Sequence, residues 1–586
     1  MLRNRFWVLA VLVVGWVACV ALGQVCPGCE FDEDLPFVEP GKTCTIIAVG
    51  KNATVDGSVI TGQSCDCGSC DFTIHLIPAA DHPEGATRKI YLLDQYSTYP
   101  DVGWTRPPRY EKIFSGVEIP EVPHTHAYIH GIFGNLNDRQ LQINESTIGG
   151  RRELRNTPGL FTISELTMIA MERCSTAREA IKLMGELAEK YGYNGRIDSA
   201  ECLAVADPNE VWIFEIYGVG PLWTPESGEP GAIWAARRVP DDEVAVVPNH
   251  SIIGVIDFED KENFMYCSHV VDFAVKNGWY DPASGKPFNF SDIYDPRYWK
   301  DGTPITPANS YGYYARIWRA LNLLAPSQNF SPDLYLHDYP FSVKPDKKLT
   351  LQDIFAFYRD HYEGTFLDMT KGVAAGPFEN PNRYPRLSFK VDGKTYYFAR
   401  PIESYHCDYV SICVSRSWLP DPIGGVFWLG LGESDTTCFM PIYIGVNELP
   451  KSITIGNHWE FDRESARWAF DYVTYHTLPF YSLTMKYVKE AQDYWETVLV
   501  LETQLVDQIA LQLYNDDPAK AKAYLTDYSK SAVDRVVKAW WELGDKLLVY
   551  FNHGYIYSEP GKRGSVSWPE WWLRLIIEKD QMQPVP

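Results

Sequence analysis

A single cysteine, Cys44, opens a run of apolar residues with the sequence CTIIAVG. A cysteine thiolate is a strong nucleophile, but a base must first take the proton of the thiol. A chain that begins at its nucleophile carries that base already, because a free α-amino group has a pKa of about 8. Cys44 could therefore act as an N-terminal nucleophile if the bond between Thr43 and Cys44 were cut. From the pattern alone, a structural cysteine in a buried strand is the alternative.

The segment before Cys44 suits such a cut. Residues 1–23 join a basic start, MLRNR, to an apolar run that ends in small residues, which is the layout of an export signal peptide. The apolar run is nearly long enough to span a bilayer, so an uncleaved N-terminal anchor is the alternative, and no other segment approaches a span. Residues 24–43 are acidic, contain Pro and Gly and lack periodicity, which is typical of a propeptide or linker. We therefore predict an exported protein, secreted or periplasmic.

The charge balance excludes one class of partner. The 586 residues carry a formal net charge of −23, whereas nucleic acid binding needs a basic face. Hydrophobic residues make up 45% of the chain and charged residues 22%, which is ordinary globular composition. We therefore predict a folded acidic protein that does not bind nucleic acid.

Thirteen cysteines are present, and export permits disulfides. The tight clusters CPGC at 26–29 and CDCGSC at 65–70 predict disulfides within each cluster, or one bond that joins the two. A joining bond would keep a cut propeptide tethered near Cys44.

Three histidines, His124, His126 and His130, have the spacing of one strand. No carboxylate or cysteine stands at a spacing that would complete a metal site with them. We predict neither a metal nor a cofactor.

The elements that position Cys44 begin as β structure. Short apolar runs separated by Gly, Asp and Asn predict strands at 44–50, 57–62 and 72–78. Apolar residues at helical spacing then predict helices at 162–174 and 175–193. A strand, a turn and a second strand follow at 200–218. Strands, a helix pair and more strands indicate an α+β domain built of sheet and helix layers.

The C-terminal part changes character. Residues 486–515 and 531–551 are amphipathic and helical. We predict that two apolar stripes pack against the rest of the protein: Val498, Leu501, Leu505, Ile509 and Leu513 on the first helix, and Val533, Val536, Val537, Trp540, Leu547 and Phe551 on the second.

The stretch CTIIAVGKNATVDGSVITG, residues 44–62, resembles the opening of the cysteine dipeptidases of the dipeptidase A type. These are relatives of the secernins within the N-terminal-nucleophile hydrolases, alongside penicillin V acylase and bile salt hydrolase. The likeness continues through HTHAYIHGIFGNLNDRQLQINESTIGGRRELR, VADPNEVWIFEIYG, VPNHS and YYARIWRALN. It implies a four-layer αββα sandwich over residues 44–455 and a helical C-terminal extension packed on it, over residues 456–586.

The resemblance also implies four catalytic residues. Cys44 matches the nucleophile, and Asp66, in GQSCD, matches the acid that orients its amine and thiol. Asn249, in VPNHS, matches the amide donor of the oxyanion hole, and Arg316, in YYARIW, matches an arginine that supports the developing charge. Read alone, these last three would be a turn aspartate, a loop asparagine in a glycosylation sequon and a helical arginine in a salt bridge.

Two further positions bear on the substrate. Thr147, in NESTIGG, lies where the acylase relatives place a second contributor to the oxyanion hole. Gln63 stands where those relatives usually carry an arginine, and a glutamine supplies neither a fixed charge nor a bidentate carboxylate contact.

The resemblance implies a peptidase that hydrolyses dipeptides through Cys44 and needs no cofactor, and the predicted signal peptide makes it an exported one. Its partner would be a dipeptide or a small amide. One alternative is hydrolysis of an N-acyl amide, as in the acylase relatives. Another is an inactive binding or scaffold protein that keeps the fold.

Overall fold

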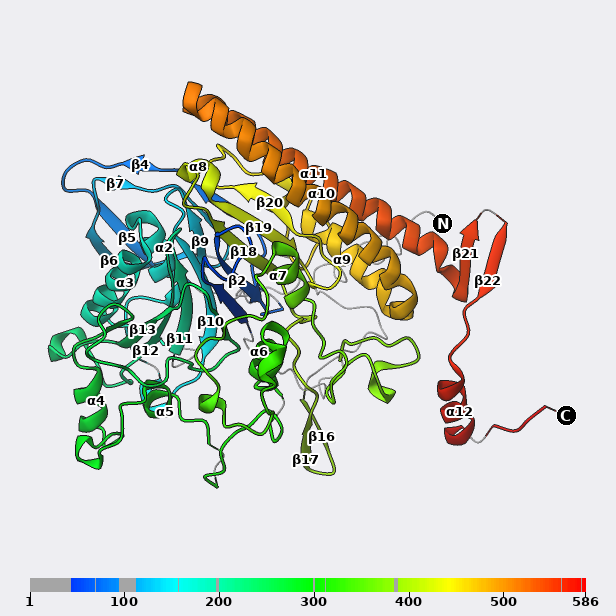
Figure 1. Ribbon diagram of the computed structural model, residues 1–586, viewed down its shortest axis with the longest axis horizontal. Helices are drawn as coiled ribbons and strands as arrows, with labels where there is room; N and C mark the ends of the chain where they lie inside the picture. Colours follow the sequence, from blue (N-terminus) through cyan, green and yellow to red (C-terminus); the bar gives the residue numbers. More distant parts are fainter. Residues whose placement is uncertain are drawn as a thin grey trace, which may run out of the picture. The chain divides into compact units, whose positions relative to one another are not determined.

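The computed structural model describes residues 44–93 without 69, 112–298 without 156 and 196–199, 301–383 without 311, and 388–585 without 560 and 581. The expected signal peptide and propeptide, residues 1–43, lie outside this part of the chain. Within the described residues, no helix combines the length and the apolar character needed to cross a lipid bilayer. The elements form an α+β fold, with two large antiparallel sheets and helices beside them (Figure 1).

The first sheet has six strands, in the order β14–β1–β2–β18–β19–β20. β1 (Thr45–Val49) and β2 (Val59–Cys65) confirm the first two predicted strands. Asp56 closes the turn between them by accepting from the backbone N–H two residues later, at 3.1 Å. Gly57 follows with φ of 90°, a conformation that residues with a Cβ rarely adopt. The other strands are β14 (Val244–Val247), β18 (Tyr409–Ser415), β19 (Val426–Leu431) and β20 (Met440–Tyr443).

The second sheet has eight strands, in the order β15–β13–β12–β11–β10–β9–β8–β3. β11 (Ala200–Ala206) and β12 (Val211–Tyr217) confirm the predicted strand, turn and strand, and the Asp207 N–H donates to Glu210 O across the turn. The other strands are β3 (His75–Ile77), β8 (Tyr128–His130), β9 (Gly134–Asn137), β10 (Gln142–Ile148), β13 (Ile233–Val239) and β15 (Phe264–Tyr266).

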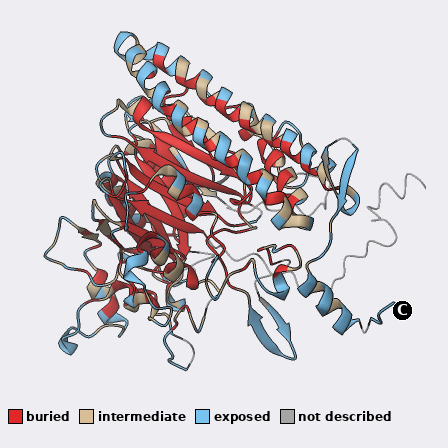
Figure 2. Cartoon of the chain, turned by 45° about the vertical axis from the view of Figure 1, so that its right-hand side comes forward, coloured by how far each residue is buried: buried red, intermediate tan, exposed pale blue. Residues whose placement is uncertain are grey.

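The two sheets pack face to face, and polar side chains bridge them. Gln142 on β10 accepts hydrogen bonds from the backbone N–H and the hydroxyl of Thr61 on β2, at 3.0 and 2.7 Å. All residues of β1, β2, β10 and β11 are buried, and Figure 2 shows both sheets as the buried centre of the protein. A site between the sheets is therefore shielded from water, which strengthens electrostatic interactions there.

Two helices cover the eight-stranded sheet, and both were predicted. α2 (Ile163–Arg173) and α3 (Ala177–Tyr191) each begin after a threonine whose side chain accepts a hydrogen bond from the first helical turn. A Cβ on Gly185 of α3 would lie 2.4 Å from the ring of Trp234 on β13. The glycine therefore allows the helix to approach the sheet closely.

Three helices cover the outer face of the six-stranded sheet: α9 (Ala466–Thr477), α10 (Tyr481–Asp516) and α11 (Pro518–Tyr550). α10 and α11 confirm the two predicted C-terminal helices and extend beyond both (Figure 1). Ser529 on α11 accepts from the backbone N–H of Tyr443 on β20 at 3.2 Å, which ties the helix to the sheet.

One of the two predicted packing stripes is wrong. Leu501, Leu505 and Ile509 on α10 are 55%, 61% and 44% exposed. The helix buries a more polar face instead, on which Glu496 pairs with Arg359 at 2.6 Å. That face consists of Gln492, Glu496, Leu499, Thr503, Val506 and Ala510. The stripe on α11 is confirmed by the burial of Val533, Val536, Trp540, Leu547 and Phe551.

The remaining elements lie around this core. Four two-stranded sheets pair β4 (Ala80–Asp81) with β7 (His124–Thr125), β5 (Thr87–Leu93) with β6 (Lys112–Pro120), β16 (Ser388–Val391) with β17 (Lys394–Tyr397), and β21 (Tyr555–Glu559) with β22 (Lys562–Ser565). The last pair lies in the region expected to be helical. The other α-helices are α4 (Val270–Lys276), α5 (Phe290–Tyr294), α6 (Ala315–Leu324), α7 (Leu351–Phe357), α8 (Asp421–Gly424) and α12 (Glu570–Lys579).

Candidate active site

Strand register brings two of the candidate positions, Cys44 and Asn249, together. Thr45 pairs with Ser64 on β2, so Cys44 and Cys65 form the next opposing pair. On the other side of β1, Ile46 pairs with Val247 of β14, so the same register continues to Asn249 beside Cys44. The nucleophile candidate thus lies at the start of a central strand with neighbours on both sides. It is 4% exposed.

Arg316 holds the backbone of this strand start. Its Nη1 donates to Cys44 O at 3.0 Å and to the Thr45 hydroxyl at 2.7 Å, and its Nη2 donates to Asn249 Oδ1 at 2.5 Å. The contact to Asn249 fixes which end of the amide faces the arginine. Burial, followed by the positive charge of Arg400, lowers the pKa of Arg316.

Asn249 turns its amide nitrogen toward β10. The residue has φ of 67°, in the left-handed region that asparagine tolerates better than most residues. Its Nδ2 donates to Thr147 O at 2.6 Å and to the Ser146 hydroxyl at 3.2 Å. Because Arg316 occupies Oδ1, the amide presents only its donor side to this strand.

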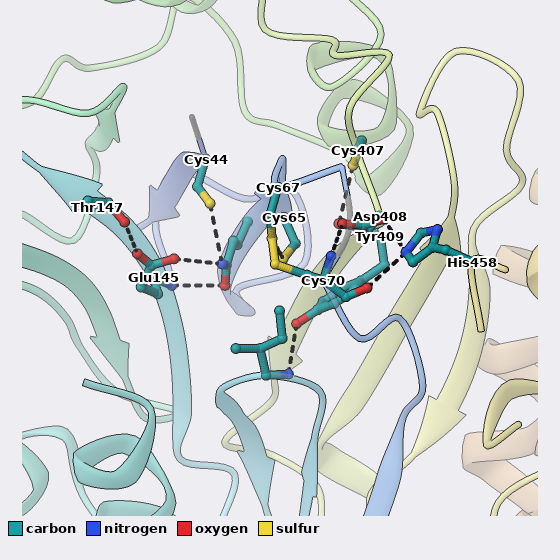
Figure 3. Close-up of a disulfide and its surroundings, with 12 residues drawn as sticks. Cys44, Cys65, Cys67, Cys70, Glu145, Thr147, Cys407, Asp408, Tyr409 and His458 are labelled. Carbon is teal, nitrogen blue, oxygen red and sulfur yellow. Dashed lines mark hydrogen bonds and ion pairs between the residues drawn. A yellow bond between two sulfur atoms is a disulfide. The ribbon is translucent and has the colours of Figure 1, made fainter. Parts of the chain in front are cut away.

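Thr147 and Gln63 meet on a buried carboxylate that the sequence analysis missed, Glu145 (Figure 3). The Thr147 hydroxyl donates to Glu145 Oε1 at 2.9 Å, and Gln63 Nε2 donates to Glu145 Oε2 at 3.1 Å. The same Nε2 lies 4.0 Å from Cys44 Sγ. No pattern in the sequence marked Glu145, because its partner Gln63 comes from another strand.

These contacts close into a ring. It runs from the Cys44 carbonyl through Arg316, Asn249, Thr147, Glu145 and Gln63 to the Cys44 thiol, and we call these six residues the Cys44 network: Cys44, Gln63, Glu145, Thr147, Asn249 and Arg316. It contains five of the six residues singled out in the sequence. The arrangement places a thiol, amide donors and a guanidinium around one point, which are the groups that acyl transfer needs.

Asp66, the sixth candidate, adjoins the network at the end of β2. Its Oδ2 accepts from the Ser64 hydroxyl at 2.7 Å and forms an ion pair with Arg400. Both Asp66 and Arg400 are buried, and burial outweighs the arginine so that the pKa of Asp66 is raised. Arg400 was not predicted from the sequence.

Cys44 also has a thiol neighbour. The hydrogen bond from Cys65 lowers the pKa of the Cys44 thiol, but burial and the negative charges of Glu145 and Asp66 outweigh it, so the pKa is raised. In this environment the thiol keeps its proton at neutral pH, and a base is needed to remove it.

The second cysteine cluster lies next to this pair (Figure 3). Cys67 and Cys70 form a disulfide, and Cys65 Sγ lies 3.4 Å from Cys67 Sγ. The other cluster, Cys26 and Cys29, lies outside the described residues, together with any bond between the two clusters.

The two histidines of the HTH segment and His130 each have a different partner. His124 pairs with Asp81, His126 with Asp138, and His130 Nδ1 lies 2.7 Å from the backbone carbonyl of Gly131. In the part of the chain that the structure describes, no group of three potential metal ligands includes any of these histidines.

Comparison with known proteins shows the family to which the chain belongs. The model of peptidase family C69 matches residues 43–494. Since the match spans most of the chain, the protein belongs to peptidase family C69 and is a peptidase. The predicted resemblance to the dipeptidase A type is thereby confirmed.

Similar curated proteins carry names of the same kind. The chain is 28% identical to a probable dipeptidase of Latilactobacillus sakei over 444 residues, which is 71% of this chain and 79% of the relative. It is 26% identical to dipeptidase A of Lactobacillus helveticus over 421 residues, 70% and 77% of the two chains. It is 24% identical to a probable dipeptidase B of Streptococcus pyogenes serotype M1 over 520 residues, 85% and 91% of the two chains.

Proposed function

We propose that the protein is an exported cysteine dipeptidase whose nucleophile, Cys44, becomes the N-terminal residue when the bond before it is cut. The observation that carries the proposal is the closed ring of contacts around Cys44, which joins a thiol to residues at five positions separated in the sequence. The names of the relatives support a dipeptide as the substrate.

In the proposed mechanism, the free amine of Cys44 takes the proton of its own thiol, directly or through water. The thiolate attacks the carbonyl carbon of the peptide bond, and the negative charge passes to the carbonyl oxygen. The Asn249 amide would exchange its longer hydrogen bond, to the Ser146 hydroxyl, for one to that oxygen, a contact worth roughly two orders of magnitude in rate. The ammonium then protonates the leaving amine, and water hydrolyses the thioester to release the acid and the thiol.

The surroundings of Asp66 support cleavage of the bond before Cys44. Its Oδ1 is buried and makes no hydrogen bond within the described residues. A free amine at Cys44 would bring a charged donor to this side of the site, whereas the amide of an uncut chain carries a single N–H and no charge. Asp66 would then orient the amine.

The proposal includes the organisation of the chain. We assign the fold to the N-terminal-nucleophile hydrolases as an αββα sandwich over residues 44–455, with an extension over 456–586 that packs on it. Residues 1–23 would be the export signal and residues 24–43 the propeptide. The helices on the outer faces of the two packed sheets support this assignment.

The intact mass and N-terminal sequence of the purified protein test the proposal. A chain that begins at Cys44, recovered outside the cytoplasm, and that hydrolyses dipeptides faster than N-acyl amides is the expected result. An active protein with the bond before Cys44 intact would overturn the mechanism. Preference for N-acyl amides would overturn the assignment of the substrate but not that of the nucleophile.

A further inference from the structure

A second polar cluster is buried among loops that flank the six-stranded sheet, and the mechanism proposed above does not use it. It consists of His361, which follows α7, Glu403, which precedes β18, and Glu433 and Asp435, between β19 and β20. These four side chains are 2%, 1%, 7% and 4% exposed. One carboxylate oxygen from each of the three acids lies within 4.8 Å of the others. We call these four residues the acidic cluster.

In the described part of the chain, two carboxylate oxygens of the cluster lack the partners that buried polar atoms normally have, and one imidazole nitrogen has ion-pair contacts alone. Glu403 Oε1 and Asp435 Oδ1 make no hydrogen bond within the described residues. His361 Nε2 points into the cluster, 3.1 Å from Glu403 Oε2 and 3.9 Å from Asp435 Oδ2, but makes no hydrogen bond of acceptable geometry there. The imidazole nitrogen thus lies close to the other oxygen of each of these two carboxylates.

Surrounding residues hold these groups in position. His361 Nδ1 lies 3.0 Å from Glu363 Oε1, which directs the other ring nitrogen toward the acids. The Tyr481 hydroxyl donates to Asp435 Oδ2 at 2.7 Å. A histidine whose second nitrogen bonds a carboxylate is the usual arrangement around a protein metal ion.

The charges of the cluster do not balance. Three carboxylates face one histidine. Arg400 acts on Glu403 and Arg359 acts on Asp435, but these arginines also pair with Asp66 and Glu496. Asp471 adds another negative charge near Glu433. Burying such a set is costly unless protons or a cation neutralise it.

We propose that His361, Glu403, Glu433 and Asp435 bind a divalent transition-metal ion. One imidazole nitrogen with three carboxylate oxygens suits Mn²⁺ or Zn²⁺, whereas Ca²⁺ and Mg²⁺ prefer oxygen ligands alone. The ion would be structural and would join three loops. One of them carries Arg400, the partner of Asp66, and the Glu403 N–H on this loop also donates to Asp360 O beside His361.

Mn²⁺ is the probe that tests the site, because Zn²⁺ would also bind free thiols such as Cys65. The full chain is stripped with chelator, incubated with Mn²⁺ and desalted, and its metal content and melting temperature are measured. We expect one Mn²⁺ per chain and a higher melting temperature than in the stripped protein. Ca²⁺ at the same concentration should give a smaller rise.

Three variants separate a metal site from an acid-rich structural core. Glu403→Gln removes a ligand and should lower Mn²⁺ affinity at least tenfold while melting no lower than the stripped wild type, because it also removes a buried charge. Glu363→Gln changes the carboxylate that contacts the His361 ring and backbone N–H, and should lower affinity roughly tenfold, as outer-shell changes do. Glu186→Gln, on the exposed face of α3, makes the same charge change and should match the wild type in Mn²⁺ affinity and melting temperature.

Two results would overturn the proposal. One is a wild type that retains no Mn²⁺ and melts at the same temperature with and without the ion. The other is a Glu403→Gln variant that binds Mn²⁺ as tightly as the wild type. A Ca²⁺ response larger than that of Mn²⁺ would remove His361 from the set of ligands. None of these measurements depends on peptidase activity.

Discussion

The Cys44 network, with the adjoining Asp66, and the acidic cluster are both buried and polar and both contain carboxylates, yet they balance their charges differently. In the network, Glu145 accepts from Gln63 and Thr147, and the adjoining Asp66 faces Arg400. In the cluster, three carboxylates share one histidine, and two of their oxygens bond to no described residue. The first region can exist with protein groups alone, whereas the second needs a cation or protons from solution.

The two regions also differ in what positions them. The network rests on β1, β2 and β10, and strand register brings Cys44 between Asn249 and Cys65. The cluster rests on loops that meet only in the folded protein. A ladder of hydrogen bonds can hold reacting groups to the tolerance that catalysis needs. Loops of different origin can be fixed to one another by a shared ion.

The largest effect should come from Cys44→Ala. We expect peptidase activity to fall by roughly three or more orders of magnitude, because no other group can form the acyl intermediate. Mn²⁺ binding should be unchanged, since the acidic cluster is untouched. The control is Cys174→Ala, which removes another buried free thiol at the end of α2 and should leave activity as in the wild type. Loss of Mn²⁺ binding in Cys44→Ala would show that the two regions are not independent of each other.

Arg400→Met should give the next largest effect, because Arg400 serves both regions. Its removal leaves the buried Asp66 carboxylate without its ion-pair partner, which should cost about 3–5 kcal/mol of unfolding free energy. Denaturant unfolding measures this loss. Arg400→Met with Asp66→Asn should lose less than the sum of the single changes, because a neutral amide needs no counter-ion. Strict additivity would show that the pair is not coupled.

Glu215 is a buried carboxylate outside both regions, and it shows how far hydrogen bonds without an ion pair can offset the effect of burial on a pKa. Glu215 accepts from the Ser251 hydroxyl and from the backbone N–H groups of Ile252 and Ile253. Burial still outweighs these bonds and raises its pKa from 4.5 to about 7. The folded protein therefore holds this proton more tightly than the unfolded chain does. The stability this proton contributes is fully present below pH 4.5 and is lost as pH rises through 7.

Glu215→Gln should remove that dependence. The unfolding free energy of the variant, relative to the wild type, should rise by about 3 kcal/mol between pH 4.5 and pH 8. Urea unfolding of both proteins across this range measures the difference in unfolding free energy. The pH dependence that the acidic cluster contributes is the same in both proteins and cancels in this difference. A constant difference would mean that Glu215 does not titrate there.

Asn249→Asp should have the smallest of these effects. Aspartate tolerates a positive φ as asparagine does, so the backbone is preserved while the amide donor is lost. We expect kcat to fall by roughly 100-fold, about 2.7 kcal/mol, with little change in KM. Steady-state kinetics on one dipeptide measures it. An equal rise in KM with kcat unchanged would make Asn249 a substrate contact only.

The sequence predicted the Cys44 network better than the cluster for a physical reason. Cys44, Gln63 and Asp66 lie within one hairpin, where the spacing of two strands fixes which residues meet. Of the candidates, only Cys44 was marked by the strand pattern itself, and the other five came from resemblance. The contacts of Thr147, Asn249 and Arg316 within the network depend on the packing of two sheets and α6. Glu145 was missed because nothing local marks a buried glutamate on a strand.

The acidic cluster and the face of α10 show where sequence patterns fail. His361, Glu403 and Asp435 belong to separate loops with no fixed spacing, so no pattern joins them. On α10, hydrophobicity favoured the row through Leu501 and Leu505, but the buried row contains polar residues. Glu496 is buried because it bonds Arg359, a partner that only the folded structure supplies.

The position of β1 has a consequence for how the protein loses activity. β1 is hydrogen-bonded on both edges and lies in the buried centre, so its amides should be among the slowest in the molecule to exchange with deuterium. Opening the strand would amount to global unfolding. Partial damage elsewhere, such as fraying of the C-terminal helices, therefore leaves the geometry at Cys44 intact, and inactivation by heat should coincide with the cooperative transition.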